Sequence, residues 1–255
     1  AATSALPDDF FYDAATFAPE AGTGQLPADF CSLHRSLGFE SSRRSNLAYL
    51  DGGKTLTYAA GNLLHFVDLE TLEQTYLPSV RSGGIGAVAV HPSAGYIAVA
   101  EKGSSPEVFI YEYPSLKLFR VLRGGTERAY SAAAFTSGGD LLATVGSYPD
   151  YMLTVWNWRE EKITLRTKAF SQEIFRVSFS PRTDGELITS GTGHIRFWQM
   201  ATTFTGLKLQ GAIGKFGQVE LSDISGYAEL PGGKVLSGTD WGNLLLWDGN
   251  LIHCE

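Results

Sequence analysis

Residues 229–249 read ELPGGKVLSGTDWGNLLLWDG, and this stretch contains the pattern that decides the fold. A Pro-Gly-Gly turn at 231–233 precedes a short, mostly apolar run at 234–237. A second turn, with Asp240 and Gly242, leads into a leucine-rich run that ends at Trp247. Glycine, proline and aspartate suit hairpin turns because they tolerate or pre-set the backbone angles that such turns need. The stretch therefore predicts two short strands, the second of which carries a large aromatic residue.

The same pattern occurs five times along the chain. A β-rich run centred on one large aromatic residue recurs at intervals of 45, 45, 42 and 49 residues, and the aromatic residues are Phe66, Tyr111, Trp156, Trp198 and Trp247. A turn rich in Gly, Pro, Asp or Ser lies 15 to 19 residues before each of them. A period of about 40–45 residues with four strands per unit is the signature of a β-propeller blade. The chain is therefore predicted to be an all-β, WD40-type propeller with about five blades.

The strands of each unit follow from the pattern. We expect second strands at 54–60, 96–101, 141–145, 187–190 and 234–237. Third strands, which carry the aromatic residue, are expected at 63–67, 108–113, 153–158, 194–200 and 243–247. More polar fourth strands are expected at 74–77, 118–122, 162–167, 207–210 and 251–254. The predicted blades span residues 45–79, 80–124, 125–168, 169–216 and 217–255, and residues 1–44 are predicted to form an extended N-terminal arm.

Two forms of ring closure are compatible with five units. The last unit stops within a few residues of its fourth strand, so we interpret the chain as part of a larger, seven-bladed propeller. A closed five-bladed ring is the alternative, and residues 30–39 would then serve as its closing strand.

Composition narrows the range of functions. The chain of 255 residues is 44% hydrophobic and 18% charged, a balance typical of a globular protein. Its formal net charge of −7 disfavours nucleic acid as a partner, because such binding depends largely on neutralising phosphates. Two cysteines, Cys31 and Cys254, form no disulfide framework, which favours a reducing, cytoplasmic compartment. Residues 1–10 do not resemble a signal peptide, and the longest aliphatic run, 85–90, is too short to span a membrane.

Docking surfaces are a better hypothesis than a catalytic site. The five histidines are scattered without metal-ligand spacing, so we predict no catalytic residue, no metal and no cofactor. Exposed aromatic residues on rigid loops are typical anchors for protein partners. The candidate contact residues are Tyr148, Pro149, Tyr151, Phe204, Phe216 and Trp241. The alternative for these residues is that they cover neighbouring blades.

Four stretches carry a resemblance to a known family. Trp247-Asp248 is a Trp-Asp dipeptide, and residues 229–249 follow the WD-repeat pattern closely. The other blades depart from it, with Trp198-Gln199, Trp156-Asn157, Tyr111-Glu112 and Phe66-Val67 in place of the dipeptide. The further stretches are EKGSSPEVFIYEYPSLKLFRVLRGGTE (101–127), NWREEKITLRTKAFSQEIFRVSFSP (157–181) and GHIRFWQMATTFTGLKLQG (193–211). Over residues 30–255 the chain resembles the N-terminal propeller of the WD-repeat cilia- and flagella-associated proteins of the dynein tether head.

The resemblance implies a non-catalytic scaffold of the ciliary or flagellar axoneme. Members of that family sit beside a paralogous WD-repeat protein and tether the motor region of an inner-arm dynein to the doublet microtubule, with direct or indirect contact to the microtubule itself. A role in ciliary motility, other axonemal proteins as partners, and a cytoskeletal location follow from the same resemblance. The alternatives are a generic WD-repeat interaction module of another cytoplasmic complex, a propeller hydrolase, or a reader of nucleic acid or the tubulin lattice.

The aromatic residue of each unit is predicted to be a wedge between blades, since a four-stranded sheet that is apolar on both faces must bury both of them. Replacing Trp198 by alanine should therefore lower the free energy of unfolding by about 3–5 kcal/mol. Urea denaturation of the two proteins measures this difference. A loss below about 1 kcal/mol would show that the residue lies on the surface.

Overall fold

Five antiparallel sheets make up a computed structural model that describes residues 10, 11, 13, 32–41 and 45–255. Each sheet has four strands, paired in chain order. The strands are β1 (Leu47–Leu50), β2 (Thr55–Ala60), β3 (Leu63–Asp68), β4 (Gln74–Pro78), β5 (Ile85–Val90), β6 (Tyr96–Glu101), β7 (Val108–Glu112), β8 (Lys117–Leu122), β9 (Tyr130–Phe135), β10 (Leu142–Gly146), β11 (Met152–Asn157), β12 (Lys162–Lys168), β13 (Ile174–Phe179), β14 (Glu186–Gly191), β15 (His194–Thr203), β16 (Gly206–Ile213), β17 (Ile224–Glu229), β18 (Val235–Thr239), β19 (Leu244–Asp248) and β20 (Leu251–Cys254). A short 3₁₀ turn, η2 (Asp51–Gly53), joins β1 to β2, and the described part of the chain contains no α-helix.

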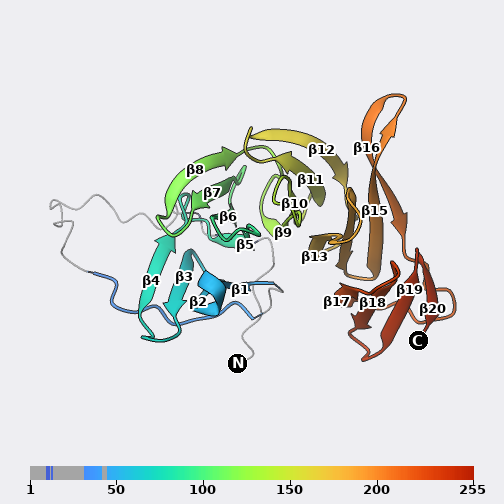
Figure 1. Ribbon diagram of the computed structural model, residues 1–255, viewed down its shortest axis with the longest axis horizontal. Helices are drawn as coiled ribbons and strands as arrows, with labels where there is room; N and C mark the ends of the chain where they lie inside the picture. The colour runs from blue at the N-terminus through green and yellow to red at the C-terminus, as the bar shows by residue number, and fades with distance from the viewer. Residues whose placement is uncertain (1–9, 12, 14–31, 42–44) are drawn as a thin grey trace.

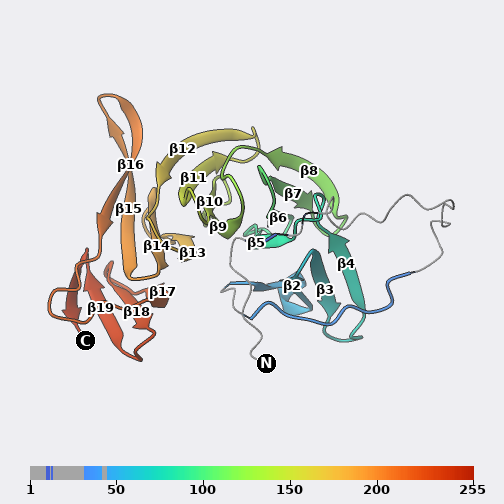
Figure 2. The same cartoon turned by 180° about the vertical axis from the view of Figure 1, so that it is seen from behind.

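The five sheets follow one another around an arc, like the blades of a propeller (Figure 1). The first strand of each blade lies on the inside of the arc and the fourth strand on the outside, as the view from behind also shows (Figure 2). The arc is open between the first blade, β1–β4, and the fifth blade, β17–β20. The prediction of an all-β propeller with about five blades is confirmed.

Small residues allow the blades to approach each other near the centre of the arc. A Cβ atom on Gly86 of β5 would lie 2.1 Å from the backbone oxygen of Tyr130, at the start of β9. Within the fourth blade, a Cβ atom on Gly191 of β14 would lie 2.0 Å from the backbone oxygen of Glu173, which directly precedes the neighbouring strand β13. Real Cβ atoms do not come so close to a carbonyl group, so any larger residue at these positions would push neighbouring segments apart.

Four hydrophobic clusters fill the junctions between blades farther from the centre. The repeated aromatic residues lie in these clusters with exposed fractions between 0 and 6%: Phe66, Tyr111, Trp156, Trp198 and Trp247. The indole N–H groups of the three tryptophans each donate to a hydroxyl on the second strand of the same blade, at 2.8–2.9 Å, and the acceptors are Thr144, Thr189 and Ser237. Each buried indole therefore has a partner for its one polar atom.

The aromatic residue of the first blade faces the opposite way from the others. In the other blades the repeated aromatic residue pairs with an apolar residue of the second strand, as Tyr111 does with Ile97 and Trp247 with Val235. In the first blade the equivalent residue of the second strand is Leu56, and it pairs with Val67 and not with Phe66. Phe66 is thus one residue out of step with the repeat. Because side chains alternate between the faces of a strand, that single step turns Phe66 toward the second blade, where its ring stacks on Tyr113 at 5.9 Å.

Residues 32–41 cover the other face of the first blade. The backbone N–H of Ser36 donates to the Tyr76 hydroxyl at 2.9 Å, and the Phe39 ring meets the Tyr58 ring at 5.7 Å. The side-chain amide of Asn46 donates to the backbone oxygen of Glu40 at 3.1 Å. Residues 32–40 adopt no strand, and most of the predicted arm, with Phe30 and Cys31, lies outside the described residues. The closing-strand role for 30–39 stays a prediction.

His65 is fully buried beneath this covering segment. Its ring lies edge-on to Tyr58 and Tyr76, with centroids 4.6 and 5.1 Å away. Neither ring nitrogen forms a hydrogen bond with a described residue. Burial lowers the pKa of His65, because the charged imidazolium loses its hydration there.

Replacing His65 by phenylalanine should make the protein less sensitive to acid. The unfolded chain protonates His65 near its ordinary pKa of about 6.5, whereas the folded protein resists protonation to lower pH. Stability is therefore lost as the pH falls below that value, and the substitution should reduce the loss between pH 7.5 and 5 in urea denaturation. Burial lowers the pKa of His91 and His194 as well, so part of the dependence should remain.

The matched control is His253→Phe, because His253 is exposed on β20. If the two substitutions change the pH profile equally, burial of His65 does not contribute to acid sensitivity.

Candidate docking surface

Two kinds of loop gather on one side of the propeller, at the same end of the strands in every blade. Strands alternate in direction, so the connection between the second and third strands emerges at the same end as the connection to the next blade. We call this side the loop rim, and it comprises residues 61–62, 79–84, 102–107, 123–129, 147–151, 169–173, 192–193, 214–223 and 240–243. Backbone hydrogen bonds tie the two kinds of loop together, including Ser147 N–H to Ala129 and Asp240 N–H to Asp223. The loop rim is therefore a connected surface.

Two buried glutamates brace the loop rim at the second blade. The carboxylate of Glu101 accepts the backbone N–H groups of Val80 and Arg81, at 2.5 and 3.0 Å. The carboxylate of Glu107 accepts the side chain of Arg81 at 3.1 Å and that of Arg123 at 2.7 Å. Burial raises the pKa of Glu101, while the two backbone donors oppose that rise. The three loops that carry these residues are thus cross-linked by charge-assisted hydrogen bonds.

The predicted contact residues of the third blade occupy this braced rim. Tyr148 is 55% exposed, and Pro149 and Tyr151 are half-buried. Tyr151 packs against the hydrophobic cluster between the third and fourth blades. Asp150 fixes the loop, because its carboxylate accepts the Thr126 hydroxyl at 2.7 Å. Tyr148 is therefore presented to solvent by a loop whose other members are held in place.

Trp241 is the second exposed aromatic residue of the loop rim. Its side chain is 66% exposed, in the turn between β18 and β19. The large apolar side chains of Leu221 and Leu244 are also exposed at this end of the fifth blade. The turn is closed by hydrogen bonds from the Gly242 and Asn243 N–H groups to Thr239. An exposed aromatic with apolar neighbours on a closed turn fits a contact for a partner.

The remaining two predicted contacts lie elsewhere. Phe204 is fully exposed at the tip of the long β15–β16 hairpin, on the rim opposite the loop rim (Figure 1). Phe216 is 9% exposed and packs edge-on against Trp247 at 5.4 Å. Its prediction as a partner contact is therefore corrected, because the segment after β16 folds back over the core of the fifth blade. Phe216 belongs to that core.

The part of the chain that the structure describes holds no group of three or more His, Cys, Asp or Glu side chains placed to bind a metal. It also contains no helix long and apolar enough to cross a membrane. The buried histidines sit in structural settings: His91 contacts the Trp158 ring at 5.6 Å, and His194 stacks on Phe170 at 3.8 Å. Both histidine rings thus belong to the packing of the blades.

Comparisons with known proteins give strong similarities, although no family model matches the chain. Cilia- and flagella-associated protein 44 of Mus musculus is 53% identical over 253 residues, which are 98% of this chain and 14% of the mouse protein. Its namesake in Chlamydomonas reinhardtii is 56% identical over 232 residues, 88% of this chain and 13% of that protein. The chain thus spans a small part of these relatives' length. Their shared name agrees with the predicted location in cilia or flagella.

A solved structure described as the RRP9 WD40 repeats superposes with a TM-score of 0.63 at 18% identity. The match covers 82% of this chain and 61% of that chain. At this level of identity the likeness concerns the fold alone, and it supports the WD40-type propeller.

Replacing Tyr148 or Trp241 by alanine should leave the protein's stability nearly unchanged, within about 0.5 kcal/mol, because both side chains are largely exposed. Trp156→Ala, in contrast, empties a fully buried site and should cost about 3–5 kcal/mol. Urea denaturation of the three variants provides the comparison. A loss above about 2 kcal/mol for Tyr148→Ala or Trp241→Ala would show that these residues cover neighbouring blades.

Proposed function

Because this chain is homologous over most of its length to a segment of cilia- and flagella-associated protein 44, we propose that it is a non-catalytic docking scaffold of the ciliary axoneme. The proposed working surface is the loop rim. Its partners are other proteins of the axoneme, held through the exposed aromatic residues of the third and fifth blades.

The observation that carries the proposal is that two large aromatic side chains are exposed on loops whose geometry is fixed by hydrogen bonds. Tyr148 and Trp241 are exposed, yet each stands in a loop that is tied by hydrogen bonds to its neighbours. A loop whose backbone is already fixed loses little conformational entropy on binding, so more of the contact energy contributes to affinity. Large aromatic residues in such settings dominate the energetics of many protein interfaces.

The finer proposal is that the scaffold contributes to the tether between an inner-arm dynein motor and the doublet microtubule. It rests on the resemblance carried by residues 101–127, 157–181 and 193–211. A paralogous WD-repeat protein and the dynein are then the expected neighbours. The net charge of −7 favours indirect attachment to the microtubule, since the tubulin surface is also acidic.

Affinity purification from flagellated cells tests the proposal. The endogenous protein is tagged and recovered from axonemal extract, either unchanged or with Tyr148→Ala and Trp241→Ala together. We expect the unchanged protein to recover inner-arm dynein and a second WD-repeat protein, and the double variant to lose at least one of them. Incorporation into the axoneme is followed by fluorescence of the same tag.

The matched control replaces two exposed leucines, Leu69 and Leu72, which lie in the turn between β3 and β4 on the opposite rim. The control should recover the same proteins as the unchanged chain. Recovery of neither dynein nor a WD-repeat partner by the unchanged protein would reject the tether role. Equal recovery by the double variant would reject the loop rim as the docking surface and leave the tether role standing.

A further inference from the structure

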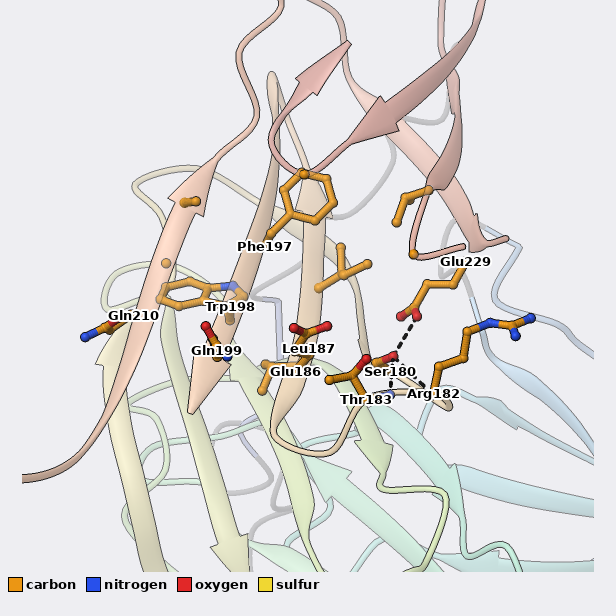
Figure 3. A pocket seen from close by; sticks show the side chains of 16 residues that line it. Ser180, Arg182, Thr183, Glu186, Leu187, Phe197, Trp198, Gln199, Gln210 and Glu229 are labelled. Carbon is orange, nitrogen blue, oxygen red and sulfur yellow. Dashed lines mark hydrogen bonds between the residues drawn. The ribbon is translucent and has the colours of Figure 1, made fainter. Parts of the chain in front are cut away.

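A groove of about 450 Å³ opens between the fourth and fifth blades, on the rim opposite the loop rim (Figure 3). Its apolar wall includes Ile188, Phe197 and Val235, which belong to the cluster between these two blades, and its polar side includes Glu186 and Glu229. The turn residues 182–183, 233 and 249 surround its mouth. None of the residues predicted from the sequence as partner contacts lines it.

A comparison of blade junctions explains why the groove exists. In the third blade, Trp158 stands two residues after Trp156 and is fully buried. Its ring fills the junction with the second blade, at 5.1 Å from Tyr96 and 5.6 Å from Phe135. The residue two positions after Trp247 in the fifth blade is Gly249, which has no side chain to fill the corresponding space. The groove is therefore a junction from which the sealing side chain is absent.

A carboxylate with one free oxygen lines the groove. Oε2 of Glu229 accepts the Ser180 hydroxyl at 2.7 Å, whereas Oε1 is buried and accepts no hydrogen bond from the described residues. The oxygen of Ser180 in turn accepts the backbone N–H groups of Arg182 and Thr183, both at 3.2 Å. These two donors fix the hydroxyl, so its single proton is committed to Oε2 and leaves Oε1 open.

The charges around the groove do not neutralise its carboxylates. Neither Glu186 nor Glu229 forms a salt bridge with any lysine or arginine in the described part of the chain. Figure 3 shows the guanidinium group of Arg182 on the far side of Glu229 from Phe197. Lys234, beside the groove, approaches Asp248 at 4.0 Å. The groove thus combines an apolar wall, two carboxylates and an unused buried acceptor.

We propose that this groove binds a lysine or arginine side chain presented by a protein partner. The hydrocarbon part of such a side chain would lie against Ile188, Phe197 and Val235, and its cationic end would donate to Oε1 of Glu229. Glu186 would supply a second negative charge nearby. An acidic or purely apolar side chain would leave the buried oxygen without a donor, which costs binding energy.

Titration of the chain with two short peptides tests the proposal. One peptide is acetyl-Gly-Ala-Arg-Ala-Gly-amide, and the other replaces arginine by citrulline, which has nearly the same shape but no charge. Binding is followed by NMR of the methyl groups of Ile188 and Val235. We expect saturable shifts with the arginine peptide, and affinity at least about tenfold lower for citrulline, a difference of about 1.4 kcal/mol. A lysine peptide that also saturates would support the proposal.

Variants locate the site. Glu229→Gln retains an acceptor for Ser180 but removes the charge, and it should weaken the arginine peptide about tenfold or more. Glu186→Gln gives a second, independent test if the first variant does not fold. The control, Glu160→Gln, lies on the same rim in the third blade, where Glu160 is exposed and pairs with Lys162 at 3.0 Å, and it should change nothing. Equal binding of arginine and citrulline peptides, no saturation at millimolar concentrations, or an unchanged affinity in both groove variants would each overturn the proposal.

Discussion

Every part of this molecule depends on one constraint: a four-stranded sheet that is apolar on both faces has to bury both of them. A single blade cannot do so, and stacking is the solution that the chain adopts. Near the centre the solution requires small residues, because Gly86 meets the backbone of the next blade directly. Farther out the wedge widens, and large aromatic residues such as Trp156 and Trp198 fill the space. The hydroxyl partners Thr144 and Thr189 make that burial tolerable for the indole N–H groups.

The same stacking explains why the surfaces for partners lie at the rims. The second, third and fourth blades have both sheet faces packed against neighbouring blades. Solvent and partners therefore reach mainly the loops that connect the strands, and the outer strands. At the loop rim, cross-links such as Glu107 with Arg81 and Arg123 turn these connections into a fixed surface. Glu107 is buried, so the two arginines offset the desolvation of its charge as well as joining the loops. A scaffold gains from this arrangement, because exposed side chains are displayed without extra flexibility.

Much of the fold was readable from the sequence, because its signal is local and repeated. The predicted second, third and fourth strands agree with the structure to within a few residues, for example at β6 (Tyr96–Glu101) and β20 (Leu251–Cys254). The facing of Phe66 was not readable, since a shift of one residue changes the face of a strand without changing the period. The exposure of the candidate contact residues was not readable either. Tyr148 and Trp241 are exposed and Phe216 is buried because of the positions of neighbouring loops, which no local pattern shows. The braces at Glu101 and Glu107 join residues from three separate loops, and no local pattern reveals them.

The residue two positions after the repeated aromatic residue decides whether the junction with the preceding blade is closed or forms a groove. Where the residue two positions after the wedge is large, as at Tyr113 and Trp158, it packs against the preceding blade and closes the junction. Where it is Gly249, the junction stays open and exposes polar groups such as Glu229 that a sealed junction would cover. The backbone at Gly249 has a φ of 58°, a conformation that favours glycine, so a large residue there would conflict with the tight turn into β20. The short turn and the open groove are thus two consequences of one residue, and a propeller can vary its binding surface in this way without disturbing the wedges that hold it together.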